Sequence, residues 1–149
     1  MSYDINFWLP SSGLNFDDWF ESFEGVYTPA ERLIISKAAQ PIHEKLRRLL
    51  GEELVEDEFN CSYEDDDTGI SFDFSLDCIV VSCPYRLGRG HEILPLMYAI
   101  AGCVMVTGDI EARDPQTGKI ASSDNLALAI ETFEDGARFS RKVISTVNP

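Results

Sequence analysis

The sequence predicts an α+β fold in which helices pack on one face of a mainly antiparallel sheet. Alternating apolar and polar residues mark strands that cluster in the middle of the chain, between residues 54 and 83. Apolar residues at three- and four-residue spacing mark helices before and after that cluster. A run of strands flanked by helices is typical of the α+β class. The 149 residues contain no repeat, low-complexity segment or linker, so we expect one domain over residues 1–149.

The N-terminal region is predicted to form a strand and then a short helix. Residues 3–9 alternate in polarity and stop at Pro10, which is typical of a strand that ends in a turn. Residues 15–23 place aromatic side chains at helical spacing. Asn15 is the expected N-cap, and the acids that follow it lie where the helix dipole favours negative charge.

The clearest helical signal follows this short helix. Thr28 is expected to cap a long helix, with Pro29 at its first position and Glu31 completing a capping box. Apolar residues then recur every three or four positions. We expect Pro41 to bend this helix and Gly51 to end it.

Three strands are predicted in the middle of the chain. Residues 59–63 and 70–76 both alternate, and the acidic turn at 64–69 between them predicts a hairpin. Residues 78–83 form a continuous run rich in β-branched side chains, which is typical of a more central strand.

The C-terminal part is predicted to contain helices and one more strand. Residues 91–105 are nearly all apolar, as in a buried helix. A short strand is expected at 109–113, followed by an Asp-Pro-Gln-Thr-Gly-Lys turn at 114–119. Two further helices are expected at 125–133 and 135–147, of which the second is more basic.

The charge of the chain is its most informative property. It has 26 acids against 12 bases, a net charge of −14, and residues 1–85 hold 18 of the acids and only 5 of the bases. Between Arg48 and Arg86 there is no Lys or Arg but there are eleven acids. Such a surface argues against a nucleic-acid ligand, because phosphate binding needs the opposite charge. A surface of one sign instead favours a basic protein partner, although charge runs also occur as simple solvated faces.

The sequence offers no signal for a membrane span or a secreted protein. No stretch reaches the ~18 apolar residues of a spanning helix, and the first residues lack the charged and apolar regions of a signal peptide. The four cysteines lack paired zinc-site spacing, so we expect reduced, mostly buried thiols in a cytoplasmic protein. No metal site and no cofactor are predicted.

Some segments only partly match known chemical motifs. Glu64-Asp-Asp-Asp-Thr-Gly imitates the start of a calcium loop, but Ser75 stands where that loop needs a bidentate Glu, which leaves at most a weak cation site. Leu87-Gly-Arg-Gly-His before a helix could bind an anion, but the pattern favours a simple connection that needs flexible glycines. A Cys83–His91 pair is conceivable as a thiol nucleophile with its base, without further supporting residues. His43 is expected to be a surface side chain.

The acidic run and the Asp-Pro-Gln-Thr-Gly turn at 114–118 together resemble an immunity protein of a bacterial contact-dependent inhibition or related polymorphic-toxin system. The resemblance implies a small, acidic, cytoplasmic α+β protein that covers a toxin domain, often a basic nuclease. The resemblance includes no catalytic motif, and it does not identify individual contact residues.

The leading hypothesis is therefore an acidic binding protein that neutralises a cognate toxin with a basic surface by covering its active site. Alternatives are a regulatory or structural protein that binds another basic partner, and a small hydrolase that uses His91. No catalytic residue is assigned. The expected partner-binding residues are acids of the short N-terminal helix and of the segment around the predicted hairpin: Asp17, Asp18, Glu21, Glu56, Asp57, Glu58, Glu64, Asp65, Asp66 and Asp67.

Overall fold

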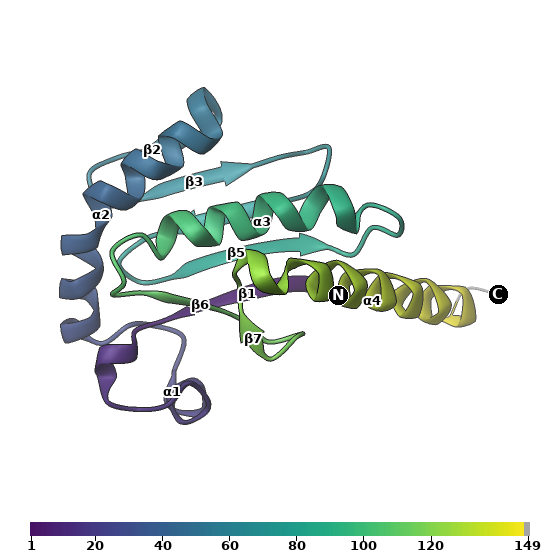
Figure 1. Cartoon of the computed structure of the whole chain (residues 1–149), viewed down its shortest axis with the longest axis horizontal. Helices are drawn as coiled ribbons and strands as arrows, with labels where there is room; N and C mark the ends of the chain where they lie inside the picture. Colours follow the sequence, from purple (N-terminus) through teal and green to yellow (C-terminus); the bar gives the residue numbers. More distant parts are fainter. Residues whose placement is uncertain (148–149) are drawn as a thin grey trace.

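The computed structural model describes residues 1–147, and in that part of the chain four α-helices accompany one seven-stranded antiparallel sheet (Figure 1). The strands are β1 (Ser2–Trp8), β2 (Val55–Glu56), β3 (Cys61–Glu64), β4 (Ser71–Phe74), β5 (Ile79–Pro84), β6 (Glu111–Asp114) and β7 (Lys119–Ile120). The α-helices are α1 (Phe16–Ser22), α2 (Pro29–Leu50), α3 (Gly90–Val104) and α4 (Leu126–Val147), and 3₁₀ turns occur at η1 (Pro10–Ser12), η2 (Gly51–Glu53) and η3 (Ser123–Asn125). The order across the sheet is β2-β3-β4-β5-β1-β6-β7. The predicted α+β class is confirmed.

The two faces of the sheet differ in what covers them. The long helices α2, α3 and α4 lie over one face (Figure 1), and the side chains that point toward them are buried. Every second residue of β1 and β5 belongs to this core, as the alternation of a strand requires. Large fully buried side chains include Tyr3, Ile5, Phe7, Phe72, Phe74, Ile93 and Phe133.

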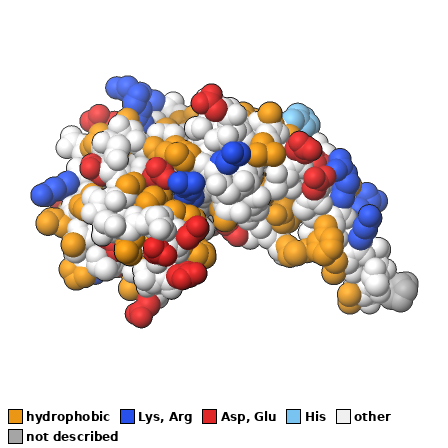
Figure 2. Space-filling view, turned by 60° about the horizontal axis from the view of Figure 1, so that its bottom comes forward, with side chains coloured by type: hydrophobic (Ala, Val, Ile, Leu, Met, Phe, Trp, Pro, Cys, Tyr) orange, Lys and Arg blue, Asp and Glu red, His pale blue; other side chains and the backbone are white. Residues whose placement is uncertain are grey.

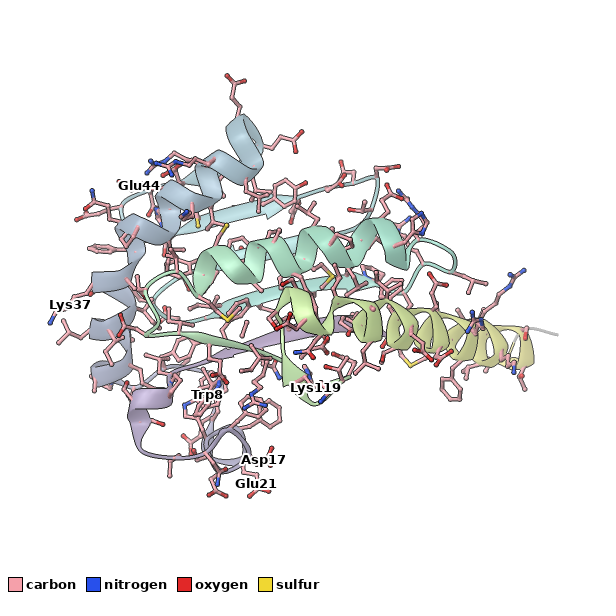
Figure 3. All side chains as sticks on the ribbon, in the orientation of Figure 1. Trp8, Asp17, Glu21, Lys37, Glu44 and Lys119 are labelled. Carbon is pink, nitrogen blue, oxygen red and sulfur yellow. The ribbon has the colours of Figure 1, made fainter. Side chains whose placement is uncertain are left out.

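Helix α2 begins as predicted. The Thr28 side chain accepts a hydrogen bond from the backbone N–H of Glu31, and the Glu31 side chain accepts one from the backbone N–H of Thr28. The helix changes direction between Lys37 and Glu44, which are labelled in Figure 3. Pro41 lies between them inside the helix, so the expected bend is explained by its missing N–H and its ring.

Helix α1 packs on the other face of the sheet, at the end of β1. Phe16 and Trp19 contact the indole of Trp8, with ring centroids 5.6 and 6.2 Å away. The Trp19 Nε1–H donates to Glu31 Oε2 at 2.9 Å, so the capping residue of α2 also fixes α1. The Asn15 side chain caps α1 as expected, by accepting a hydrogen bond from the Asp18 N–H.

The predicted break in the last helix is wrong. Residues 126–147 form one continuous helix α4 rather than two. Gly136 lies inside it and does not break it, because glycine in a helix costs only about 1 kcal/mol relative to alanine. Tyr85 packs directly on this glycine, where an added Cβ would lie 2.7 Å from Tyr85 Cζ.

Two strands were not predicted. Strands β2 and β7 are two residues long each and form the two edges of the sheet. Such short segments carry no alternation that a sequence pattern can reveal.

The Asp-Pro-Gln-Thr-Gly turn is anchored in the core by its first residue. Asp114 is fully buried and accepts hydrogen bonds from the hydroxyls of Tyr3 and Tyr98. Its other oxygen accepts from the backbone N–H groups of Gln116 and Thr117. This carboxylate therefore ties β6, its turn, β1 and α3 together.

Candidate partner-binding surface

The sheet face opposite the long helices carries small and polar side chains. We call it the open face and define it by the outward-pointing residues of the seven strands, apart from Trp8, on which α1 packs: Ser2, Asp4, Asn6, Val55, Ser62, Glu64, Ser71, Asp73, Val80, Ser82, Pro84, Glu111, Arg113 and Ile120. All of them are partly or fully exposed. The registers place one residue from each strand in a single row, which runs from Val55 at one edge to Ile120 at the other.

Two shallow hollows lie on either side of the Asn6–Val80 pair at the centre of this row. The first, of about 470 Å³, is lined by Val80 and by residues of β2, β3 and β4, and no Lys or Arg lines it. The second, of about 430 Å³, is lined by Asn6, Arg113 and residues of α1. The Arg113 guanidinium lies 5.6 Å from the ring centroid of Phe16, and its Nε donates to Glu111. The second hollow therefore holds its own cation in place, whereas the first is acidic.

The three predicted acids of α1 form one end of this surface. Asp17, Asp18 and Glu21 are all exposed, and Asp17 lines the second hollow. Figure 3 shows Asp17 and Glu21 pointing away from the sheet. The Asp18 carboxylate accepts a hydrogen bond from the Asn15 side chain, which leaves Asp17 and Glu21 without internal partners in residues 1–147.

The predicted acids at the β2–β3 corner are partly engaged within the molecule. Glu56 accepts two hydrogen bonds from Arg47 Nε, at 2.9 and 2.8 Å, and this interaction holds the pKa of Glu56 below its usual value. Asp57 caps the corner by accepting from the N–H groups of Phe59 and Asn60. Of the three acids here, Glu58 alone has no such partner among the described residues.

The predicted acids of the β3–β4 turn lie at the opposite end of the sheet from the β2–β3 corner, because β3 runs between them. Asp65 organises the turn, since it accepts from the Asp67 N–H and the Thr68 hydroxyl. Asp67 pairs with Arg89 at 2.8 Å. Glu64 lies on the open face, and Asp66 is exposed and unpaired within the described chain.

The ten predicted residues therefore do not form one continuous patch. They form three groups around the open face, and five of them stabilise the fold locally. The sequence analysis also missed acids on that face, among them Asp4 and Asp73. Both stand between buried aromatic or aliphatic residues of a strand, so the period-two alternation predicted their outward direction, although neither was assigned to the partner-binding set.

The glycine-containing loop before α3 is filled by a side chain of the protein itself. The Glu134 carboxylate accepts hydrogen bonds from the N–H groups of Gly88 and Gly90, both at 2.8 Å. The groups that an external anion would need are thus occupied by α4. The loop connects β5 to α3, and Glu134 ties it to α4.

Cys83 and His91 lie in very different surroundings. The Cys83 thiol is fully buried and donates to the carbonyl oxygen of Thr68, and burial raises its pKa to about 11. His91 is exposed in the first turn of α3. Because the thiolate is the nucleophile, a buried thiol with a raised pKa does not favour thiol catalysis at neutral pH.

The expected surface position of His43 is wrong. Its side chain is buried against Phe74, with ring centroids 5.6 Å apart. Charged neighbours in sequence suggested exposure, but His43 lies on the same helix face as Ile35, Ile42 and Leu46. Burial lowers the pKa of His43, and Glu56, with Oε1 at 3.7 Å from Nδ1, partly offsets that effect.

The expectation of mostly buried cysteines holds for half of them. All four are free thiols; Cys61 and Cys83 are buried, Cys103 is half-buried and Cys78 is exposed. Cys78 directly precedes β5 and lines the first hollow. Burial raises the pKa of Cys61 to about 12.

Within residues 1–147, no three His, Cys, Asp or Glu side chains lie close enough together to hold a metal ion. In the same range, none of the helices combines the length and apolar character that crossing a membrane requires. No protein-family model matches the chain, and neither a curated protein nor a solved structure does.

Proposed function

We propose that this protein is an acidic inhibitor of a basic bacterial toxin, of the immunity-protein type, which covers the toxin through the open face and the acids around it. The observation that carries the proposal is the uncovered sheet face with unpaired acids on it. Asp73 and Glu64 are exposed there and make no ion pair within the described chain. Its one cation, Arg113, is already paired with Glu111.

The shape of the face suits a protein partner better than a small ligand. The hollows are shallow and their lining is mixed, whereas small-molecule sites are enclosed and mostly apolar. Basic side chains of a partner fit the first hollow, which is lined by Asp73 and the serines beside it. Exposed Phe20 at the rim of the second hollow is available as an aromatic anchor.

The role as a toxin inhibitor is tested by co-expression. The product of the gene that neighbours this one in its own genome is expressed in a bacterial host with and without the protein. Growth arrest that the protein relieves supports the proposal, and the purified pair should then form a complex. A neighbour that does not arrest growth, or an arrest that the protein does not relieve, would refute it.

The surface is tested by matched triple variants in the same pair. The open-face variant is Asp4→Asn, Glu64→Gln, Asp73→Asn. The control variant is Glu44→Gln, Asp124→Asn, Glu131→Gln, which removes the same number of exposed acids outside that face. We expect the open-face variant to associate about tenfold more slowly at low salt and to lose salt dependence, because charges at an interface steer association. Equal effects of the two variants would mean that only net charge matters.

A further inference from the structure

The last turns of α4 extend beyond the rest of the molecule. The α4 arm, residues 138–147, projects past the end of the sheet (Figure 1). Every side chain in it except Ser140 is exposed. By contrast, Ala129, Phe133 and Ala137 of the same helix are buried in the body. The arm therefore continues a core-packing helix without a core beneath it.

The arm is apolar along one side. Phe139, Val143 and Val147 recur at four-residue spacing, and Ile144 lies beside them. Their exposed fractions are 61, 41, 71 and 64% in that order. Such a stripe on an isolated helix would normally be covered, because burial of each large apolar side chain is favourable.

The arm is also the basic part of an acidic protein. Arg138, Arg141 and Lys142 lie on the sides of the helix away from the stripe, and no acid occurs in residues 136–147. Residues 1–137 carry all 26 acids and nine bases, a net charge of −17. Figure 2 shows Lys and Arg side chains beside hydrophobic ones at this projecting end.

The root of the arm is acidic, in contrast to its tip. Glu131 and Asp135 are exposed on α4 just before the arm, and Asp135 pairs with Arg138, the first residue of the arm, at 2.7 Å. Glu134 binds the loop before α3, and Arg89 of that loop is shared between Asp67 and Glu92. Acids of α4, α3 and the β3–β4 turn thus gather at the end of the body from which the arm leaves.

We propose that the α4 arm is a self-association surface that docks on a second copy of this chain. Two arms packed antiparallel about a twofold axis cover each other's apolar stripe, since a twofold interface joins the same patch on both copies. In that arrangement the basic tip of each arm meets the acidic root of the other. A basic toxin does not suit the arm, because like charges repel.

The test measures molar mass by light scattering and sedimentation over a concentration series of the purified full chain. We expect a dimer for the wild-type protein. The arm variant Phe139→Ser, Ile144→Ser should dissociate at least about tenfold more readily, because exposed apolar anchors carry most of the energy of such interfaces. Its control is Val26→Ser, Leu33→Ser, two residues that are 61 and 56% exposed outside the arm, which should leave the dimer unchanged. The charge variant Arg141→Glu, Lys142→Glu should weaken the dimer most at low salt.

A wild-type protein that stays monomeric up to millimolar concentration would overturn the proposal, as would a dimer that the arm and charge variants leave intact. Vesicles of neutral and anionic phospholipid provide the competing outcome. Sedimentation of the monomer with them, lost in the arm variant, would assign the arm to a lipid surface instead. Circular dichroism of each variant shows whether helix content is retained, and Arg141→Glu, Lys142→Glu leaves the apolar stripe intact if the arm variant fails to fold.

Discussion

The carboxylate of Glu134 accepts a hydrogen bond from the backbone N–H of Gly90, the first residue of α3, at 2.8 Å. Its second oxygen accepts from Gly88. A side chain from α4 thus satisfies amides at the N-terminus of α3, which would otherwise lack partners. The negative charge also complements the positive end of the helix dipole.

The Glu134 interaction should contribute measurably to stability. We expect Glu134→Ala to lower the free energy of unfolding by about 2–3 kcal/mol, because charge-assisted hydrogen bonds are lost and amides remain unsatisfied. Urea unfolding provides the measurement. Glu131→Ala, an exposed acid one helical turn earlier, is the matched control and should change stability by less than about 0.5 kcal/mol. Equal effects of the two would contradict the assigned role.

Gly136 should not tolerate alanine, although alanine is the better helix former. An added Cβ would lie 2.7 Å from Tyr85 Cζ, so we expect Gly136→Ala to destabilise by about 1–3 kcal/mol. In contrast, nothing lies within 4 Å of an added Cβ at Gly102 in α3, and Gly102→Ala should stabilise by up to about 1 kcal/mol. Thermal and urea unfolding compare the two. The prediction fails if Gly136→Ala still destabilises equally in a Tyr85→Ala background.

His43 should make stability depend on pH. Its pKa is lowered in the folded state by burial, so the unfolded chain binds a proton first as the pH falls. Neutral His43 contributes fully to the free energy of unfolding above about pH 6.5, the pKa of histidine in the unfolded chain. This contribution is lost as the pH falls from there toward the lower pKa of His43 in the folded protein.

The test of this pH dependence compares wild type with His43→Gln, which does not titrate. We expect the difference in free energy of unfolding between them to fall by up to about 1 kcal/mol from pH 7.5 to 5.5. The many carboxylates titrate in both proteins, so their effect cancels in the difference. An unchanged difference at the two pH values would show that His43 does not titrate in this way.

Asp114 should be the least replaceable acid of the chain. One Asp114 oxygen accepts from Tyr98 in the core and the other from Gln116 in the turn. In Asp114→Asn, the side-chain NH2 group would therefore face one of these hydrogen-bond donors. We expect Asp114→Asn to cost about 2–4 kcal/mol. Asp109→Asn, at an exposed position before β6, should cost little. Comparable urea midpoints for the two variants would contradict this role for Asp114.

The sequence predicted those parts of the fold that depend on local chemistry. Residues close in the chain account for the N-cap at Asn15, the capping box at Thr28, the bend at Pro41 and the inward alternation of β1. The two helices expected at 125–133 and 135–147 are one helix, in which Gly136 packs against Tyr85, about fifty residues earlier in the chain. His43 was misplaced because its neighbours in sequence are charged, whereas its surroundings are set by β4.

The acidic surface was predicted only in part for a similar reason. Composition identified the acid-rich segment, but it did not distinguish Glu58 and Asp66, which are unpaired in residues 1–147, from Glu56 and Asp67, which bind Arg47 and Arg89. Those pairings join different elements, so no local pattern reveals them. Alternation gives the outward direction of Asp73, but its place beside Ser62 and Val80 follows from the register between strands, which the sequence pattern does not specify.

Strands β2 and β7, at the two margins of the sheet, are only two residues long. An exposed strand margin offers unpaired backbone groups on which another chain can assemble, and long flat margins promote aggregation. Here each margin offers too little backbone for that. Another chain therefore finds little backbone at either margin with which to extend the sheet, and whatever binds the open face must recognise its side chains.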